Sequence, residues 1–164
     1  MVEVKVYKKG KQELPKYETI GAAGFDIRAD FQGKTEFMGD GFIYNDETKE
    51  ITLKAQGGRV LVPTGLFMEI PQGYELQIRP RSGLALKYGI SLVNCVATID
   101  SDYRGEIGII LLNTGFKDFT FKDDERIAQG VLSAVEQLKF KRVSLDAFAH
   151  SERGTGGFGH TGKK

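Results

Sequence analysis

The sequence contains little cysteine, little histidine and little excess charge, and each shortage excludes a class of protein. A single cysteine, Cys95, among 164 residues excludes an internal disulfide framework and a zinc site of several cysteines, and it fits a reducing compartment. The two histidines, His150 and His160, are too few and too separated to indicate a metal site. A net charge of +1 argues against a general nucleic-acid or membrane-surface binder, which would carry a basic excess.

Long hydrophobic runs are also missing. No stretch approaches the roughly 18 apolar residues that a membrane span requires, and the start, MVEVKVYKKG, alternates apolar and charged residues, unlike a signal peptide. We therefore expect a cytoplasmic protein with no membrane and no direct nucleic-acid partner. The length of 164 residues is typical of one domain, and the 40% hydrophobic and 27% charged content is typical of a globular chain.

What the chain does contain is alternation of apolar and polar residues, which predicts β-strands. The stretch 105–113 has a longer apolar centre, as a buried strand would, and the valines and Gly130 in 125–140 favour strands over a helix. The other predicted strands are 2–7, 49–55, 58–71, 74–80 and 116–122. Many short strands with frequent turn signals indicate a sandwich, barrel or jelly roll.

The turn signals divide the chain into a domain and a tail. We expect a single β domain over 1–148, with a short turn at 143–149, followed by a glycine-rich arm over 149–164. Within the domain, 31–58 mixes glycine, acids and aromatics, which predicts an added surface hairpin around 36–53 with YNDETKE at its turn.

The start of the one expected helix, 82–89, is the first candidate site. Gly89 provides its C-terminal stop. Unpaired N–H groups at a helix start bind anions, Ser82 and Gly83 supply a hydroxyl and a bare backbone, and Arg81 adds a forked cation. The alternative is that Ser82 only caps the helix and Arg81 is a surface residue, which is the commoner use of such residues.

Acids and the tail supply further candidates. Asp100 follows the apolar run CVATI, which would hold an ionised carboxylate at a strand end where it could activate water; the alternative is an ordinary turn, DSDYRG. Asp26 and Asp30 are either site acids or ordinary solvated acids. In the arm, Phe158 could stack on a flat ring, unless the arm is an ordinary disordered terminus. Together these features indicate a nucleotide ligand.

Taken together, these stretches make the chain similar to the homotrimeric dUTPases, deoxyuridine 5′-triphosphate nucleotidohydrolases. That family shows five short motifs in a fixed order, and all five occur here between residues 22 and 162: AAGFDIRA, RPRSGLALKYG, NCVATIDSDYRGE, DERIAQ and RGTGGFGHTG. The resemblance implies an all-β, jelly-roll-like β-clip or β-barrel subunit with one short helix. It also implies a homotrimer with shared active sites, each closed by a flexible C-terminal arm.

The resemblance further implies the reaction. It is the hydrolysis of dUTP to dUMP and pyrophosphate by water attacking the α-phosphorus in line, with Mg²⁺ bound to the triphosphate. Such an activity keeps uracil out of DNA and supplies dUMP for dTMP synthesis.

Residue roles also come with the resemblance. Asp100 would orient the attacking water, Asp26 would hold the metal through water, and Tyr103 would pack against deoxyribose and leave no room for a 2′-hydroxyl. The implied phosphate contacts are Arg81, Ser82, Gly83, Gln129, Arg153, His160 and Thr161. The implied uracil and sugar contacts are Asn94, Thr98, Ile99, Tyr103, Phe158 and Gly159. Structural support is expected from Asp102, Arg104 and Arg126.

Two departures from the family pattern stand out. Ala97 occupies the position, three residues before the catalytic aspartate, where the family usually has glycine, and it could shift the uracil-reading hairpin if a positive φ or close approach is needed there. The segment 31–58 is longer than the family's usual link, and it could serve a protein partner.

Two other functions compete with this interpretation. One is a dCTP deaminase-like nucleotide enzyme of the same fold, which IDSDYRGE disfavours. The other is a non-catalytic regulatory binding module on the dUTPase fold, which the presence of Asp100, Arg81, Ser82 and the arm disfavours.

Overall fold

The structure, a computed structural model, describes residues 2–10 and 13–157. These contain thirteen strands, one α-helix and one 3-10 helix. The strands are β1 (Lys5–Lys8), β2 (Phe25–Arg28), β3 (Gly39–Asp40), β4 (Phe42–Asn45), β5 (Glu50–Leu53), β6 (Arg59–Pro63), β7 (Leu66–Glu69), β8 (Tyr74–Pro80), β9 (Ile90–Leu92), β10 (Ala97–Ile99), β11 (Gly108–Asn113), β12 (Phe119–Lys122) and β13 (Arg126–Ala134). The helices are α1 (Ser82–Tyr88) and the 3-10 helix η1 (Leu145–Ala147). Neither described helix has the length and apolar character needed to cross a membrane.

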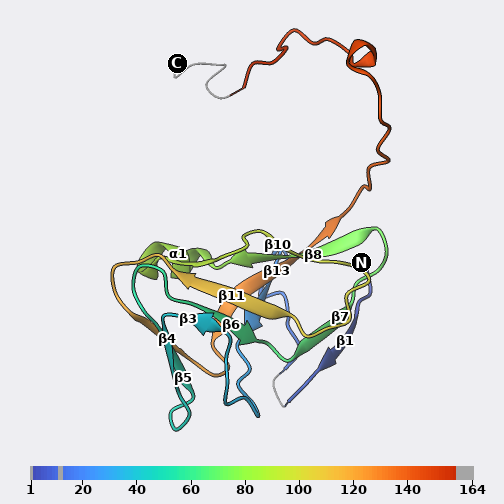
Figure 1. Cartoon of the computed structure of the whole chain (residues 1–164). Helices are drawn as coiled ribbons and strands as arrows, with labels where there is room; N and C mark the ends of the chain where they lie inside the picture. Colours follow the sequence, from blue (N-terminus) through green and yellow to red (C-terminus); the bar gives the residue numbers. More distant parts are fainter. Residues whose placement is uncertain (1, 11–12, 158–164) are drawn as a thin grey trace.

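The strands form four antiparallel sheets, so the all-β class with one short α-helix is confirmed (Figure 1). Their strand orders are β10-β8-β13-β2, β3-β6-β11-β9, β12-β5-β4 and β1-β7. Alternate residues of these strands point inward, as the period-two pattern requires, and they join into a single buried cluster. Its largest fully buried side chains include Phe31 and Phe121. One core therefore fixes all four sheets relative to one another.

Of the expected strands, 74–80 keeps its limits as β8, the others are shorter or shifted, and three of them differ most. The stretch 58–71 forms two strands, β6 and β7, because Gly65 takes a positive φ of 64° between them. The first strand begins at Lys5 rather than Val2. In 125–140 the strand ends at Ala134; the N–H of Val135 still donates to the carbonyl of Gly73 at 2.9 Å, and residues 135–140 are exposed.

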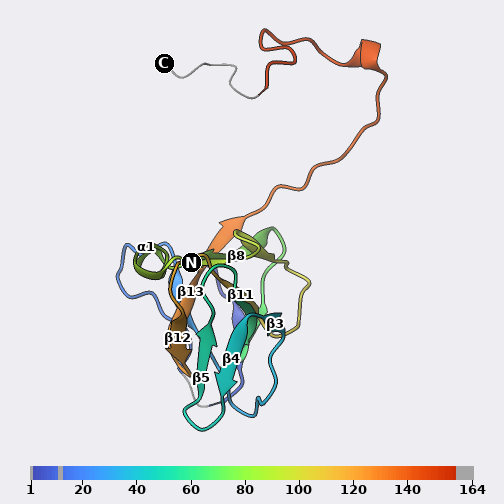
Figure 2. The ribbon, with the colours of Figure 1, turned by 60° about the vertical axis from the view of Figure 1, so that its left-hand side comes forward.

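The expected hairpin in 36–53 contains β4 and β5, which pair from Phe42 to Asn45. Its position differs from the expectation, because β5 is not a surface strand. Ile51 and Leu53 are fully buried, and β5 pairs with β12 on its other side. In the sheet order β12-β5-β4, β5 is the central strand, so β4 is the only strand of the hairpin that lies at an edge (Figure 2). The central position of β5 follows from its hydrophobic face, since a buried face must pack against the core.

Surface ion pairs on this sheet shift several pKa values. A hydrogen bond from the Lys49 ammonium lowers the pKa of the Asp46 carboxyl in the β4–β5 turn. Desolvation, followed by the hydrogen bond to Asp46, raises the pKa of Tyr44. On the neighbouring strand the Lys54 ammonium lowers the pKa of Asp118 by hydrogen bonding. The lysine contacts thus stabilise the ionised carboxylates of Asp46 and Asp118, whereas desolvation favours the neutral phenol of Tyr44.

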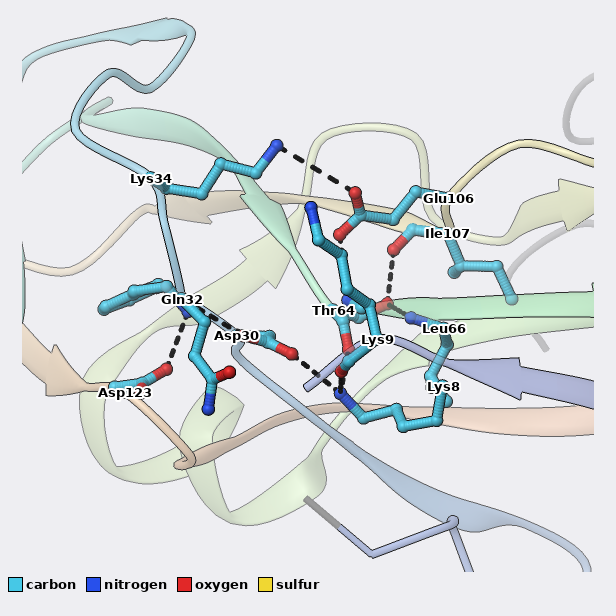
Figure 3. A network of polar contacts seen from close by, with 12 residues as sticks. Lys8, Lys9, Asp30, Gln32, Lys34, Thr64, Leu66, Glu106, Ile107 and Asp123 are labelled. Atoms are coloured by element: carbon cyan, nitrogen blue, oxygen red, sulfur yellow. Dashed lines mark hydrogen bonds and ion pairs between the residues drawn. The ribbon is translucent and has the colours of Figure 1, made fainter. Parts of the chain in front are cut away.

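A buried ion pair between Lys8 and Asp30 connects β1 to the segment that follows β2 (Figure 3). Lys8 Nζ donates to Asp30 Oδ2 at 2.8 Å and to the carbonyls of Lys9 and Thr64 at 3.0 Å each. All three ammonium donors are therefore used. Asp30 also accepts from the backbone N–H of Gln32, at 3.1 Å. With 5% of its side chain exposed, Asp30 is not the solvated acid that was one reading of the sequence.

Replacing Asp30 by asparagine is expected to lower the free energy of unfolding by about 3 kcal/mol, because Lys8 then stays buried without a countercharge. Urea unfolding at one fixed protein concentration measures this. Glu69→Gln is the matched control, since it breaks the Lys5–Glu69 pair, whose side chains are 77% and 48% exposed, and such exposed pairs contribute little. Equal stability of the two variants would contradict the role given to the buried pair.

The C-terminal segment 135–157 leaves the folded body after β13 and runs away from it (Figures 1 and 2). The 3-10 helix η1 lies where the short turn at 143–149 was expected. The segment exposes large apolar side chains: Leu138, Phe140, Leu145 and Phe148 are 77%, 89%, 87% and 70% exposed. Apolar groups gain stability only when they are removed from water. Among the described residues, none covers these four side chains, so they remain available for contact with another surface.

Candidate active site

Arg81 marks one end of the candidate site, at the junction of β8 and α1. It occupies the N-cap position with extended backbone angles, φ −84° and ψ 127°, and no side chain caps the helix. The alternative that Ser82 is the cap is therefore wrong: Ser82 is the first helical residue. Ser82 and Gly83 are exposed, and no acidic residue lies in the first turn. An anion approaching this end meets N–H dipoles and no carboxylate from the first turn of the helix.

Asp26 holds the Arg81 guanidinium in place. Its Oδ1 accepts from Arg81 Nε at 2.9 Å, and its Oδ2 accepts from Arg126 Nη1 at 3.1 Å. Arg81 Nη1 donates in addition to the Arg126 carbonyl at 3.0 Å. One carboxylate thus orients two arginines that come from β13 and from the end of β8. Each of these residues lies in a different sequence motif. Only the fold shows that they contact one another.

Gln129 lies on the same side of the molecule as Arg81. In the sheet it stands between Asp26 on β2 and Arg79 on β8. Its Nε2 donates to the carbonyl of Pro80 at 2.8 Å, directly before Arg81. The structure therefore gathers five of the expected residues at the end of β8: Asp26, Arg81, Ser82, Gly83 and Gln129.

The expected uracil-reading hairpin joins β9 to β10. Asn94 and Thr98 are exposed, and Ile99 is half-buried against the core. Ala97 lies in β10 opposite Ile78 of β8, and it is not among the described non-glycine residues with positive φ. The alanine is therefore compatible with the local backbone, which takes ordinary strand geometry at this position.

Asp100 follows β10 directly and is exposed. Its carbonyl accepts from the Tyr103 N–H at 3.2 Å, so the DSDYRG stretch does form a turn. This turn uses only the backbone carbonyl of Asp100, so the side-chain carboxylate remains available for another role. The side chain lines an open cleft of about 1050 Å³ together with Glu75 and Thr98.

The two groups of residues lie at opposite ends of β8. Ile99 pairs with Leu76, so the next residue, Asp100, lies beside Glu75 at the start of the strand. Arg81 follows Pro80 at its far end. At about 3.3 Å per residue, the distance along the strand is roughly 20 Å. A group acting on a substrate atom must lie within about 3.5 Å of it. Within one chain, the backbones of Asp100 and Arg81 are therefore far apart compared with the reach of a group that acts on a single phosphate.

The remaining expected residues belong to the C-terminal arm. Arg153 donates from Nε to the carbonyl of Gly156 at 2.7 Å, a contact within the segment 135–157 that runs away from the folded body. Phe158, Gly159, His160 and Thr161 lie outside the described residues. Within 2–10 and 13–157, no group of three or more His, Cys, Asp or Glu side chains could hold a metal ion.

The chain is similar to known proteins in both fold and sequence. A dUTPase of the Staphylococcus bacteriophage 80alpha, solved with dUpNHpp, superposes with a TM-score of 0.76 at 22% identity, covering 98% of each chain. A dUTPase variant from the Staphylococcus aureus phage phi11, described with a structural Mg(II) ion, gives 0.68 at 17% identity, covering 86% of this chain and 96% of that one. The chain thus has the fold of the dUTPases.

Sequence comparison extends this from fold to family. The dUTPase family model matches residues 46–162. The deoxyuridine 5′-triphosphate nucleotidohydrolase of Fusobacterium nucleatum is 47% identical over 162 residues, which cover 99% of this chain and 98% of that protein. The enzyme of the same name from Finegoldia magna is 45% identical over 161 residues, 98% of this chain and 99% of that one. The chain belongs to the dUTPase family.

Proposed function

We propose that this chain is a dUTP diphosphatase, which hydrolyses dUTP to dUMP and pyrophosphate in a homotrimer of jelly-roll-like subunits with shared active sites. The observation that carries the shared site is the separation of Asp100 from Arg81 by roughly 20 Å along β8. If both act on one triphosphate, as the family membership implies, we infer that they come from different subunits. The exposed apolar residues of 135–157 support the same assembly, because a neighbouring subunit would cover them.

Asp100 would act on the attacking water. Its carboxylate stands free at the end of β10, while its backbone carbonyl is fixed in the turn to Tyr103. A positioned carboxylate can accept a proton as water attacks the α-phosphorus in line with the departing pyrophosphate. The proton then passes to Asp100, and the bond between the α-phosphorus and the bridging oxygen breaks.

The phosphates would lie against the start of α1. Arg81, already oriented by Asp26, would donate to phosphate oxygens together with the exposed N–H groups of Ser82 and Gly83. Gln129 would add a contact from β13. These groups are fixed before the substrate arrives, so they stabilise the charge that develops on the pyrophosphate without reorganisation.

The hairpin and Tyr103 would select the nucleoside. Backbone groups from Asn94 to Ile99 would hydrogen-bond the uracil edge, which differs from the edge of cytosine, and a tight hairpin would collide with the methyl group of thymine. Tyr103 would pack against deoxyribose and exclude a 2′-hydroxyl. Phe158 and Gly159 would cover the base, and Arg153, His160 and Thr161 would close over the terminal phosphate as the arm folds down.

Mg²⁺ fits the residues that are present. This ion keeps several waters and usually binds through one or two carboxylates plus substrate phosphates, and the described residues offer no dedicated cage for it. Asp26 would contact it through water. Each of its oxygens accepts one guanidinium hydrogen bond, which leaves lone pairs for a water molecule. The ion would neutralise charge on the triphosphate.

The test is magnesium-dependent pyrophosphate release from dUTP, with dCTP, dTTP and UTP in parallel. We expect kcat/KM for dUTP to exceed the other three by at least about 10²-fold, because the hairpin would reject the cytosine edge of dCTP and the methyl group of dTTP, and Tyr103 would exclude the 2′-hydroxyl of UTP. Release from dCTP or dTTP would mean that the hairpin with Ala97 does not discriminate, whereas release from UTP would mean that Tyr103 does not exclude the ribose. No release from any of them would instead favour a regulatory binding protein, with 31–58 as the first surface to examine for a partner.

A further inference from the structure

Glu106 fastens the loop after Asp100 to the turn between β6 and β7. Its Oε1 accepts from the backbone N–H of Gly65 at 2.8 Å. The next residue, Ile107, is held by the same turn: its carbonyl accepts from Thr64 Oγ1 at 2.5 Å, and its N–H donates to the carbonyl of Leu66 at 2.8 Å. Figure 3 shows Glu106 and Ile107 beside Thr64 and Leu66. Three hydrogen bonds therefore join residues 106–107 to residues 64–66.

The turn that receives these bonds is itself fixed by the core. Thr64 is fully buried, and its carbonyl accepts from Lys8, whose ammonium is paired with Asp30 (Figure 3). On the solvent side, Lys34 Nζ lies 4.0 Å from Glu106 Oε2. The backbone at Glu106 is thus attached to a rigid base, because a buried and fully paired polar network resists displacement.

The Tyr103 ring takes its position from that backbone. Its hydroxyl donates to the carbonyl of Glu106 at 2.9 Å. The ring folds back over Gly105, where a Cβ atom would lie 2.3 Å from the Tyr103 hydroxyl oxygen. Only glycine permits this approach. With 43% of Tyr103 exposed, packing restrains the ring little, so the hydroxyl anchor determines where it lies.

We propose that Glu106 is a positioning residue for sugar selection: it holds the backbone to which Tyr103 is anchored, and thereby keeps the ring where it excludes a ribose 2′-hydroxyl. This inference rests on the proposed role of Tyr103. A ring excludes a hydroxyl only if it cannot move aside, and a displacement of about 1 Å at a distance from the chemistry can change rates by as much as 10²-fold. Glu106 itself touches neither substrate nor reacting atoms.

The test is the sugar selectivity of Glu106→Ala, defined as kcat/KM for dUTP divided by kcat/KM for UTP. Both substrates are measured on one enzyme preparation, so the ratio does not depend on how much of the variant is folded. We expect the ratio to fall about tenfold, since the variant loses one of the three hydrogen bonds that hold the anchor of Tyr103, and the Gly65 contact is the only one made by a side chain of residues 106–107. Glu47→Ala is the matched control, because Glu47 is exposed in the β4–β5 turn; its ratio should equal that of the wild type.

Two further variants distinguish positioning from general support of the fold. Glu106→Gln keeps an oxygen that can accept from Gly65, so it should retain the wild-type ratio. Tyr103→Phe removes the hydroxyl anchor and keeps the ring, so it should lower the ratio. In the double variant Glu106→Ala with Tyr103→Phe, the two effects should not multiply, because both act on one contact.

The outcomes that overturn the inference are distinct from those that overturn the function. If Tyr103→Ala lowers the ratio but Glu106→Ala does not, Tyr103 selects the sugar and Glu106 does not position it. An equal fall of kcat/KM for both substrates in Glu106→Ala would make Glu106 a structural residue only. If Tyr103→Ala leaves the ratio unchanged while dUTP is still hydrolysed, the role of Tyr103 fails and the inference fails with it.

Discussion

Asp100→Asn is expected to lower kcat for dUTP by about 10²–10⁴-fold, the usual contribution of a positioned general base. The amide has nearly the same size as the carboxylate and still forms the backbone turn to Tyr103, whose hydrogen bond uses only the carbonyl of residue 100. What it loses is the charge that orients water and accepts its proton. Binding of the analogue dUpNHpp, measured by calorimetry, should therefore remain close to that of the wild type.

Asp102→Asn is the control for this variant. Asp102 lies two residues away and is exposed in the same cleft, but we assign it no contact with substrate. Pyrophosphate release by this variant should match the wild type. Weak binding combined with normal turnover in Asp100→Asn would refute the role of Asp100 as the group that acts on water.

Truncation after His150 is expected to lower kcat/KM for dUTP by at least about 10²-fold, because it removes Arg153 and the whole glycine-rich end of the chain. Loss of one donor to developing charge typically lowers the rate by that amount, and the truncation also removes the stacking ring of Phe158. Glycines allow the arm to wrap a ligand closely, and its ordering is offset only when substrate is bound. The measurement is steady-state pyrophosphate release.

The matched control is truncation after Thr161, which deletes only the last three residues, Gly162 to Lys164. Light scattering reports whether the oligomer survives in both proteins. We expect a trimer in both, because the truncation after His150 keeps the exposed apolar residues of 138–148. A fully active protein lacking 151–164 would show that the arm is not a lid. Dissociation into monomers would show that it serves assembly instead of closure.

Much of this protein could be predicted from local patterns alone. Period-two alternation located the strands at 74–80 and 105–113, and Gly89 marked the end of α1, where it takes the left-handed φ of 71° that a helix stop needs. Such signals depend on neighbouring residues only. The five motifs, in their fixed order, then indicated the dUTPase family, to which the comparisons assign the chain.

Burial and long-range pairing were beyond the reach of the same patterns. Asp30 reads as a solvated acid, yet it is buried with Lys8, 22 positions earlier. A surface hairpin was expected from the polar turn at 46–49, but β5 is buried because β12, far along the chain, pairs with it. Strand alternation gives the two faces of a strand and does not say which neighbour covers them.

The sequence by itself indicated the all-β class with one short helix, the family and the residue types of the site, because these depend on local spacing and on short motifs. The tertiary structure alone decided how the residues are arranged. It placed Asp26 between Arg81 and Arg126, and it linked Glu106 to the Gly65 turn. It also put Asp100 and Arg81 at opposite ends of β8. The reason is physical: strand pairing brings together residues that are distant in sequence, and its register fixes distances that no local pattern contains.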